Sequence, residues 1–310
     1  MSLLVTVPTD RVAAGLGALP ADVDLRVWDM KTPAPAERID IVVPPYMGST
    51  GSLDALDGLS IGLVQSQSIG YDGVADILPS GMPFANAASV HEPSTAELAV
   101  GMMIAAQRQI PRFVRAQDRG EWAPVVAESL ADRRVLLVGI GGVGKAIAQR
   151  LAPFEVTMTA VARSARNEHV DGVGDMEVHG IDELPALLSD AEIVVLSLPG
   201  TDETHHLFDV ELLDRMAPGA LLVNVGRGPL IDTDALVAAL NDGRIRAALD
   251  VFEQEPVPAG HPLWSAPNLL MTPHGGGAST AMNPRMAKLI RIQIERMLAG
   301  EQPVNVVIPG

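Results

Sequence analysis

The sequence predicts an α/β protein with two doubly wound parallel-sheet domains, and three observations lead to this fold class. Short β-branched runs alternate along the chain with Ala- and Leu-rich segments of helical length. The strand-like runs are apolar, as expected for strands covered on both faces. The chain has 310 residues, a length at which a single hydrophobic core tends to divide into two.

The predicted strands form two series. The first series comprises Leu3–Val7, Leu25–Trp28, Ile39–Val43, Ile61–Gln65 and Phe84–Asn86. The second comprises Val135–Val138, Val156–Val161, Ile193–Leu198, Leu221–Val225, Ala247–Val251 and Leu269–Met271. Helices are expected in most of the gaps, including Gly142–Ala152, Thr233–Asn241 and a last one near Ser279–Ala299.

A long helix is predicted over Pro93–Gln107, between the two series. Its residues are apolar on most faces, which leaves two interpretations open. It is either a core helix or a helix whose Ala, Gly and Met side chains pack against a partner subunit. The segment Arg119–Pro124 is expected to be a loop that leads into the second series.

Composition excludes several classes of protein. The net charge is −16 and the pI is about 4.7, so nucleic acids and anionic membranes are poor partners. The absence of cysteine excludes disulfides and thiolate metal sites, and we expect no metal at the site. The start of the chain does not resemble a signal peptide, and the longest apolar stretch, near Leu98–Ala106, is too short to span a membrane. We therefore expect a cytoplasmic protein.

The segment RVLLVGIGGVGKAIAQ, residues 134–149, predicts a strand, a glycine turn and a helix. In such a turn Gly139 permits the sharp bend, Gly141 lets backbone approach a pyrophosphate, and Gly144 lets the helix pack closely on the strand. The pyrophosphate lies on free N–H groups at the positive end of the helix dipole. We expect a Rossmann dinucleotide site formed by Gly139, Gly141, Gly142, Val143 and Gly144.

The residues after the next strand favour NADP(H) over NAD(H). A site for NAD usually has an Asp or Glu there, which binds the ribose 2′-hydroxyl. This chain has Arg163, Ser164 and Arg166 instead. Guanidinium groups suit a phosphate dianion, so these three residues are predicted to bind the 2′-phosphate. The alternative is an ordinary solvated basic loop.

Three blocks follow the glycine turn in a fixed order: LVNVGRGPLID (222–232), AALDVFEQEP (247–256) and NLLMTPHGGGAS (268–279). With LSLPGTDETHHLF (196–208) and HPLWSAPN (261–268), they resemble the D-isomer-specific 2-hydroxyacid dehydrogenase family, in particular its NADPH-dependent glyoxylate/hydroxypyruvate reductase branch. The resemblance covers essentially the whole chain. It implies a Rossmann cofactor domain and a smaller, flavodoxin-like substrate domain.

The resemblance also implies catalytic roles. Arg227 matches the residue that holds the substrate carboxylate and polarises the 2-oxo group, His274 matches the catalytic histidine, and Glu255 matches the carboxylate that supports it. Asp250 matches the residue near the nicotinamide carboxamide. Thr95, at the start of the long helix, is expected either to reach the nicotinamide or, like Ser94, to cap that helix. The chemistry is consistent, because an imidazole with a pKa near neutrality delivers protons well and a neighbouring carboxylate orients it.

Substrate-binding residues are expected in the first series of strands. Ser68, Ile69 and Gly70 resemble the family loop whose backbone N–H groups hold the substrate carboxylate. Tyr46 and Met47 are expected to line the pocket for the substrate side chain. Small polar residues also form ordinary turns, which is the alternative for this loop.

The resemblance implies a discontinuous substrate domain, residues 1–98 and 279–310, and a dinucleotide-binding domain, residues 99–278. The predicted reaction is hydride transfer from NAD(P)H to a small 2-oxo acid, which gives a D-2-hydroxy acid, and the reverse. Glyoxylate and hydroxypyruvate are the favoured substrates. A homodimer is expected. The alternatives are a phosphoglycerate or phosphite dehydrogenase of the same family, or a non-catalytic nicotinamide-sensing protein similar to the family's corepressors.

Overall fold

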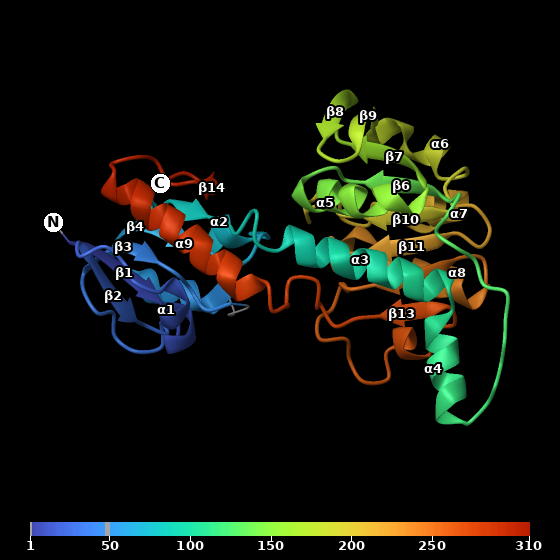
Figure 1. Cartoon of the computed structure of the whole chain (residues 1–310), viewed down its shortest axis with the longest axis horizontal. Coiled ribbons are helices and arrows are strands. Elements are labelled where there is room, and N and C mark those ends of the chain that lie inside the picture. Colours follow the sequence, from blue (N-terminus) through green and yellow to red (C-terminus); the bar gives the residue numbers. More distant parts are fainter. Residues whose placement is uncertain (1, 47–49) are drawn as a thin grey trace. The chain divides into compact units, whose positions relative to one another are not determined.

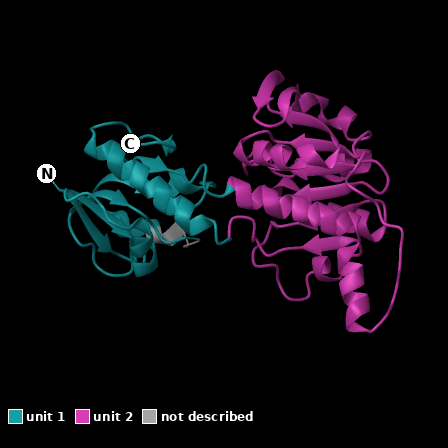
Figure 2. Ribbon diagram, in the orientation of Figure 1, with its two compact units in different colours: residues 1–91, 279–310 teal, residues 92–278 magenta. Residues whose placement is uncertain are grey.

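The computed structural model describes residues 2–46 and 50–310, which form two compact units (Figure 1). Unit 1 comprises residues 1–91 and 279–310, and unit 2 comprises residues 92–278 (Figure 2). The chain therefore enters unit 2 at the first residue of the long helix, earlier than residue 99. The whole helix belongs to unit 2 because its side chains pack there.

Unit 1 contains a six-stranded sheet in the order β14-β5-β4-β3-β1-β2. Its strands are β1 (Leu3–Val7), β2 (Val23–Val27), β3 (Arg38–Val42), β4 (Ser60–Gln65), β5 (Phe84–Ala85) and β14 (Val306–Ile308). Its helices are α1 (Asp10–Leu16), α2 (Val74–Ile77) and α9 (Met282–Leu298), together with the 3₁₀ helix η1 (Thr50–Leu56). All the pairings are parallel except that of β14 with β5. The edge strand β14 was not predicted from the sequence.

Both faces of the unit 1 sheet are covered by apolar side chains. Val5 and Ile41 pack on one face with residues of α1 and α9. On the other face Val42 and Val64 pack with residues of η1 and α2. Burial on both faces explains why the strands are apolar along their length.

Unit 2 contains an eight-stranded sheet in the order β13-β12-β11-β10-β6-β7-β9-β8. Its strands are β6 (Arg134–Val138), β7 (Thr157–Ala162), β8 (Arg166–Val170), β9 (Gly174–Gly180), β10 (Ile193–Leu196), β11 (Leu221–Asn224), β12 (Arg246–Leu249) and β13 (Leu269–Met271). Its helices are α3 (Glu92–Gln107), α4 (Ile110–Asp118), α5 (Gly142–Leu151), α6 (Leu184–Leu187), α7 (Val210–Arg215) and α8 (Thr233–Asn241). The sheet is parallel except for the β8–β9 hairpin.

Alternate residues of β6 point to opposite sides of the unit 2 sheet, as the twofold period of a strand requires. Leu136 and Val138 pack in the cluster that includes residues of α6, α7 and α8. Val135 and Leu137 pack in the cluster that includes residues of α3 and α5. The two hydrophobic layers hold the sheet rigid and fix the ends of its strands.

Helix α3 is a core helix of unit 2. Ala96, Ala99, Met102 and Met103 are buried in the cluster formed with α5 and the sheet. Of the two interpretations left open by its apolar sequence, the structure therefore supports the core helix. None of the described helices is long and apolar enough to cross a membrane.

Candidate active site

The candidate site lies at the carboxyl ends of the parallel strands of unit 2. The glycine turn follows β6, Arg163 follows β7, Arg227 follows β11, Glu255 follows β12 and His274 follows β13. Parallel strands all end at the same edge of a sheet, so these segments are gathered there. The strand order reverses between β10 and β6, which is the topological position at which open α/β sheets bind ligands.

His274 and Glu255 form a close pair. His274 Nδ1 lies 2.6 Å from Glu255 Oε2. The other carboxylate oxygen, Oε1, accepts a hydrogen bond from the backbone N–H of Phe252 at 2.8 Å. Glu255 is thus held by its own loop and can fix the orientation of the imidazole.

The electrostatic environment keeps the imidazole protonated more readily than usual. The hydrogen bond that His274 donates to Glu255 raises the pKa of His274; partial burial and the charge of Arg227 oppose this, and the charge of Asp250 adds to it. For Glu255, partial burial acts to raise the pKa, but the hydrogen bonds from His274 and Phe252 outweigh it and lower the pKa. The pair therefore favours an imidazolium beside a carboxylate.

Asp250 braces the loop that carries His274. The carboxylate is buried, with 2% of the residue exposed. Oδ1 accepts hydrogen bonds from Thr272 Oγ1 at 2.6 Å and from the Gly275 N–H at 2.8 Å, and Oδ2 accepts one from the Gly276 N–H at 2.8 Å. His274 itself has φ = 52°, a left-handed conformation that needs such support. Sequence reasoning did not single out Thr272.

Arg227 is held between two glycines for a steric reason. A Cβ on Gly228 would lie 1.9 Å from the carbonyl carbon of Phe252, and a Cβ on Gly226 would lie 2.7 Å from the carbonyl oxygen of Leu198. Asn224, at the end of β11, accepts from the Gly226 N–H at 3.0 Å and donates to the Arg227 carbonyl at 2.8 Å. Asn224 is thus a positioning residue that sequence reasoning missed. Its signal was a polar residue at the end of a wholly buried strand.

The glycine turn has the shape that its spacing predicts. Gly139 has φ = 105°, and a Cβ on Gly144 would lie 2.1 Å from the Gly139 carbonyl oxygen. A Cβ on Gly141 would meet nothing within 4 Å. Gly141 is the N-cap of α5 and gives no side-chain hydrogen bond to the first turn. The N-cap residue therefore supplies no side-chain acceptor to the first turn of this ten-residue helix, and a helix start of this kind suits an anion.

Arg163, Ser164 and Arg166 lie together directly after β7, beside the glycine turn, whose Gly139 N–H donates to the Val161 carbonyl. The Arg163 side chain is 83% exposed, and its Nη2 lies 3.2 Å from Glu203 Oε2. Arg166 donates through Nε to Glu168 at 2.7 Å and through Nη1 to the Ser164 carbonyl at 3.3 Å. Two donors of Arg166 are therefore already bound by groups of the protein. Arg163 is more exposed to solvent, so a ligand can reach its guanidinium more easily.

Thr95 lies beside the loop braced by Asp250. A Cβ on Gly276 would be 3.1 Å from Thr95 Cγ2 and 3.0 Å from Asp250 Oδ2. The structure therefore brings together two residues that the sequence placed near the nicotinamide. Thr95 itself is buried.

The loop predicted to hold the substrate carboxylate lies in unit 1, directly after β4. The Ser68 N–H donates to Ser66 Oγ at 3.0 Å, which occupies it. Asn86 Nδ2 donates to the Ile69 carbonyl at 2.9 Å and fixes the loop. Within residues 2–46 and 50–310, the N–H groups of Ile69 and Gly70 have no hydrogen-bond acceptor.

His91, which directly precedes α3, is held by neighbouring groups of unit 1. It is buried, its Nε2 lies 2.6 Å from the Gln67 carbonyl oxygen, and its ring stacks on Tyr46 with centroids 5.6 Å apart. These contacts tie Tyr46 to the loop after β4. Met47 lies outside the described residues.

Comparisons with known proteins agree with this arrangement. A family model described as D-isomer specific 2-hydroxyacid dehydrogenase, NAD binding domain, matches residues 100–276. Glyoxylate reductase from Thermofilum pendens is 33% identical over 264 residues, which cover 82% of this chain and 76% of that protein.

Two crystal structures are similar over nearly the whole chain. A D-isomer specific 2-hydroxyacid dehydrogenase from Xanthobacter autotrophicus Py2, in complex with NADPH and MES, has a TM-score of 0.82 at 32% identity and covers 99% of this chain and 98% of that one. An NADPH-dependent glyoxylate/hydroxypyruvate reductase from Sinorhizobium meliloti, in complex with NADP and malonate, has a TM-score of 0.78 at 28% identity and covers 99% and 97%.

These matches show that the protein has the two-domain α/β fold of an NAD(P)-dependent oxidoreductase. The chain belongs to the D-isomer specific 2-hydroxyacid dehydrogenase family.

Proposed function

We propose that the protein is an NADPH-preferring reductase of small 2-oxo acids, with glyoxylate and hydroxypyruvate as the favoured substrates and D-2-hydroxy acids as products. The observation that carries this proposal is the His274–Glu255 pair, joined at 2.6 Å. The names of the relatives from Thermofilum pendens and Sinorhizobium meliloti support the choice of substrate. The proposal also takes unit 2 as the cofactor domain and unit 1 as the substrate domain.

His274 is the proposed proton donor. Because Nδ1 is bonded to Glu255, Nε2 is the nitrogen that presents a proton to the 2-oxo oxygen. The raised pKa of His274 favours retention of that proton as pH rises. In the reverse direction, the same nitrogen accepts the proton from the hydroxyl group.

Arg227 is the proposed partner of the substrate carboxylate. Its guanidinium carries a permanent charge and paired N–H donors, which suit a carboxylate and stabilise negative charge as it develops on the adjacent 2-oxo oxygen. Its charge is close enough to affect the pKa of both His274 and Glu255. Arg227 thus holds the substrate carboxylate, and His274 protonates the adjacent 2-oxo oxygen.

The residues around the glycine turn fit a dinucleotide. Gly141, Gly142 and Val143 lie at the uncapped start of α5 and would hold the pyrophosphate, with Gly139 and Gly144 shaping the turn. Asp250 and Thr95 would lie near the nicotinamide. When bound, this cofactor supplies the hydride for the 2-oxo carbon.

Preference for NADPH would arise from Arg163, Ser164 and Arg166. The Arg163–Glu203 pair is highly exposed on both sides, so it contributes little and a phosphate dianion can replace Glu203. We expect Arg163→Ala to lower kcat/KM for NADPH by about 10- to 100-fold, the value of a hydrogen bond to a charged group, and to leave NADH unaffected. Arg166→Ala should have the smaller effect, since Glu168 already binds Arg166. Equal losses with both cofactors would contradict the assignment.

In unit 1, the N–H groups of Ile69 and Gly70 are the proposed carboxylate-binding donors, with Ser68 shaping the loop. Tyr46 and Met47 are proposed to face the substrate side chain.

A homodimer is also proposed, and exposed apolar side chains on and after α4 support it. Phe113 and Val114 are exposed on the helix, and Trp122 and Val126, which follow it, are 94% and 99% exposed. We expect sedimentation equilibrium to give a dimer and Trp122→Ser to weaken it. A monomer at micromolar concentration would contradict this part of the proposal.

The activity is tested by assaying the purified protein with NADPH and NADH against glyoxylate, hydroxypyruvate, pyruvate and 3-phosphohydroxypyruvate, and with NADP⁺ and NAD⁺ against phosphite. We expect the highest kcat/KM with hydroxypyruvate or glyoxylate and NADPH. A preference for the phosphorylated acid or for phosphite would move the protein to one of those alternatives. No turnover with any substrate would contradict the enzyme assignment and favour a nicotinamide-sensing protein.

A further inference from the structure

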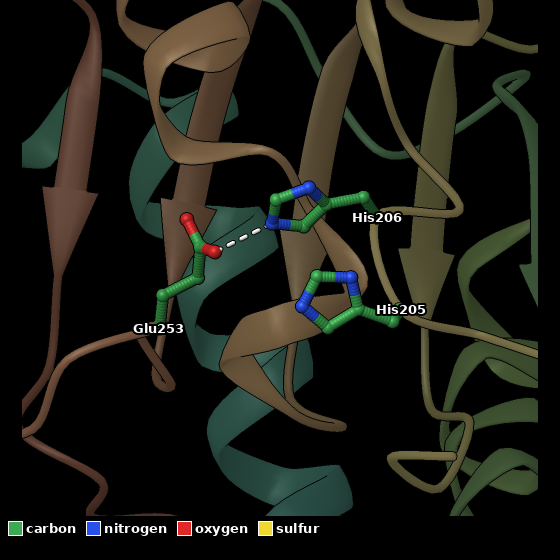
Figure 3. A group of neighbouring side chains, drawn as sticks. All are labelled: His205, His206 and Glu253. Atoms are coloured by element: carbon green, nitrogen blue, oxygen red, sulfur yellow. Dashed lines mark hydrogen bonds and ion pairs between the residues drawn. The ribbon is translucent and has the colours of Figure 1, made fainter. Parts of the chain in front are cut away.

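A second group of chemically reactive side chains lies in unit 2, apart from the proposed catalytic residues. His205 and His206 lie in the loop between β10 and α7, and Glu253 lies in the loop after β12. Each offers one ligand atom, and these atoms all lie within 4.8 Å of one another. Figure 3 shows the two imidazole rings side by side, with Glu253 facing them. Across residues 2–46 and 50–310, no other group of His, Cys, Asp and Glu side chains has this arrangement.

His206 and Glu253 are held by contacts with each other and with neighbouring backbone groups, and His205 stacks on His206. His206 Nε2 lies 2.6 Å from Glu253 Oε1, and Glu253 Oε2 accepts from the Thr233 N–H at 2.9 Å. The His206 N–H donates to the Pro229 carbonyl at 2.7 Å. The rings of His205 and His206 stack with centroids 4.0 Å apart. Little side-chain freedom would therefore be lost when a ligand joins them.

The charge of the surroundings favours a cation. A cavity of about 400 Å³ beside the cluster is lined by Asp232, Asp234 and Glu253 among other residues. The chain as a whole carries a net charge of −16.

We propose that His205, His206 and Glu253 bind one divalent cation of the borderline class represented by Zn²⁺. Two imidazole nitrogens and one carboxylate oxygen match the preference of such ions, and water completes a tetrahedral set. The chain has no cysteine to compete for the ion. The sequence analysis expected no metal, because the chain has no cysteine to supply thiolate ligands.

A bound ion would join two loops that are separate in the sequence. One loop, residues 201–206, contacts the segment after Arg227 through the His206 N–H. The other carries Glu253. Binding to the folded state alone raises its stability by mass action, so the ion would act as a clip between the loops.

The test uses Zn²⁺ as the probe and metal-stripped full-length protein in competition with a chromogenic chelator. We expect one Zn²⁺ per chain in the wild type and affinities weaker by about tenfold or more in His205→Asn, His206→Asn and Glu253→Gln, because each loses a direct ligand. His169→Asn is the matched control. His169 is an exposed histidine 2.6 Å from Asp175 and outside the cluster, so its loss should change nothing.

Two controls keep the result interpretable: the melting temperature without metal, and the variant His274→Asn. Glu253→Gln retains an oxygen that can accept from the Thr233 N–H, so we expect the fold to be preserved, and the melting temperature checks this for each variant. Wild-type affinity in any of the three cluster variants would overturn the proposal. So would a loss of Zn²⁺ in His274→Asn with no loss in His206→Asn, because the ion would then occupy the His274–Glu255 pair.

Discussion

Two histidine–glutamate pairs lie at the same edge of the unit 2 sheet, and they are similar in contact distance and exposure, although His274 uses Nδ1 and His206 uses Nε2. His274–Glu255 and His206–Glu253 both have a contact of 2.6 Å. Their side chains are similarly exposed, at 41% and 32% for the first pair and 36% and 30% for the second. Both glutamates come from the loop after β12, and each accepts a backbone N–H with its second oxygen.

The pairs differ in their neighbours. His274 is influenced by the charges of Arg227 and Asp250, whereas His206 is stacked on a second imidazole, His205. A guanidinium beside an imidazole suits an anionic substrate and proton transfer. A second imidazole suits a metal ion. A close histidine–glutamate contact therefore does not by itself indicate proton transfer or metal binding. The side chain beside the pair, Arg227 in one case and His205 in the other, distinguishes the two.

The largest expected effect comes from removing the group that distinguishes the first pair. We expect Arg227→Gln to lower kcat/KM for hydroxypyruvate by about 10³-fold, because the carboxylate and the developing oxyanion both lose their cation. The affinity for Zn²⁺ should not change. Arg215→Gln is the control, since Arg215 pairs with Glu211 on the surface of α7. A loss of less than tenfold in Arg227→Gln would show that the guanidinium is not what separates the two pairs.

The next largest effect is expected from a substitution that disturbs both histidine–glutamate pairs together. Gly228 packs against the backbone of Phe252, directly before the loop that carries both glutamates. We expect Gly228→Ala to lower the free energy of unfolding by about 3 kcal/mol, since its Cβ would overlap backbone that cannot move aside. Gly101→Ala, in open space on α3, should cost nothing. Chemical denaturation measures both. Unchanged stability in Gly228→Ala would mean that the loop is free to shift.

A smaller effect separates the two glutamates. Glu255 raises the pKa of His274, so the imidazolium needed for reduction is lost only as pH rises through that raised value. In Glu255→Gln we expect the alkaline fall of kcat/KM to begin at a lower pH than in the wild type. At pH values above the start of that fall, the variant should have kcat/KM lower than the wild type by about tenfold or more. Glu183→Gln, which removes the carboxylate beside His179, is the control and should leave the profile in place. Glu255→Gln should also keep the wild-type affinity for Zn²⁺.

The smallest effect is on stability. Because the pKa of His274 is raised in the folded state, the ion pair contributes most below the usual imidazole range, and this contribution is lost as pH rises through the raised pKa. The pair is more than one-third exposed on the histidine side, so solvent screening limits the contribution to less than about 1 kcal/mol. Protonation of Glu255 at low pH also removes the pair, since the pKa of that carboxylate is lowered but not abolished. Thermal unfolding of the wild type and Glu255→Gln should therefore differ slightly between the pKa values of the two groups and converge as pH rises through the raised pKa of His274. A difference that grows as pH rises through the imidazole range would have the wrong sign.

The sequence predicted the layered fold well, because buried parallel strands are apolar along their length. Each predicted strand is present, while β8, β9 and β14 were missed. These three lie at or next to sheet edges, and β8 (RNEHV) is mostly polar and exposed, so it lacks the apolar signal. The parallel character of the sheets holds except at those edges.

The candidate site was predicted only in part. The glycine turn follows from its spacing and flanking elements, because each glycine answers a local steric need. The roles of Arg227, Glu255 and His274 came from a family resemblance, since no local pattern indicates that residues 255 and 274 meet. The bracing by Asn224 and Thr272 and the His206–Glu253 contact depend on how separate loops pack, which the sequence alone does not reveal.

The central claim is that His274 delivers the proton in the reduction of a 2-oxo acid. The most direct measurement is the oxidation of NADPH by hydroxypyruvate with the wild type and His274→Asn, with NADPH binding measured on the same preparations and His169→Asn as control. We predict that His274→Asn binds NADPH as the wild type does but turns over at least about 100-fold more slowly, while His169→Asn is unaffected. Equal turnover in the wild type and His274→Asn would contradict the claim.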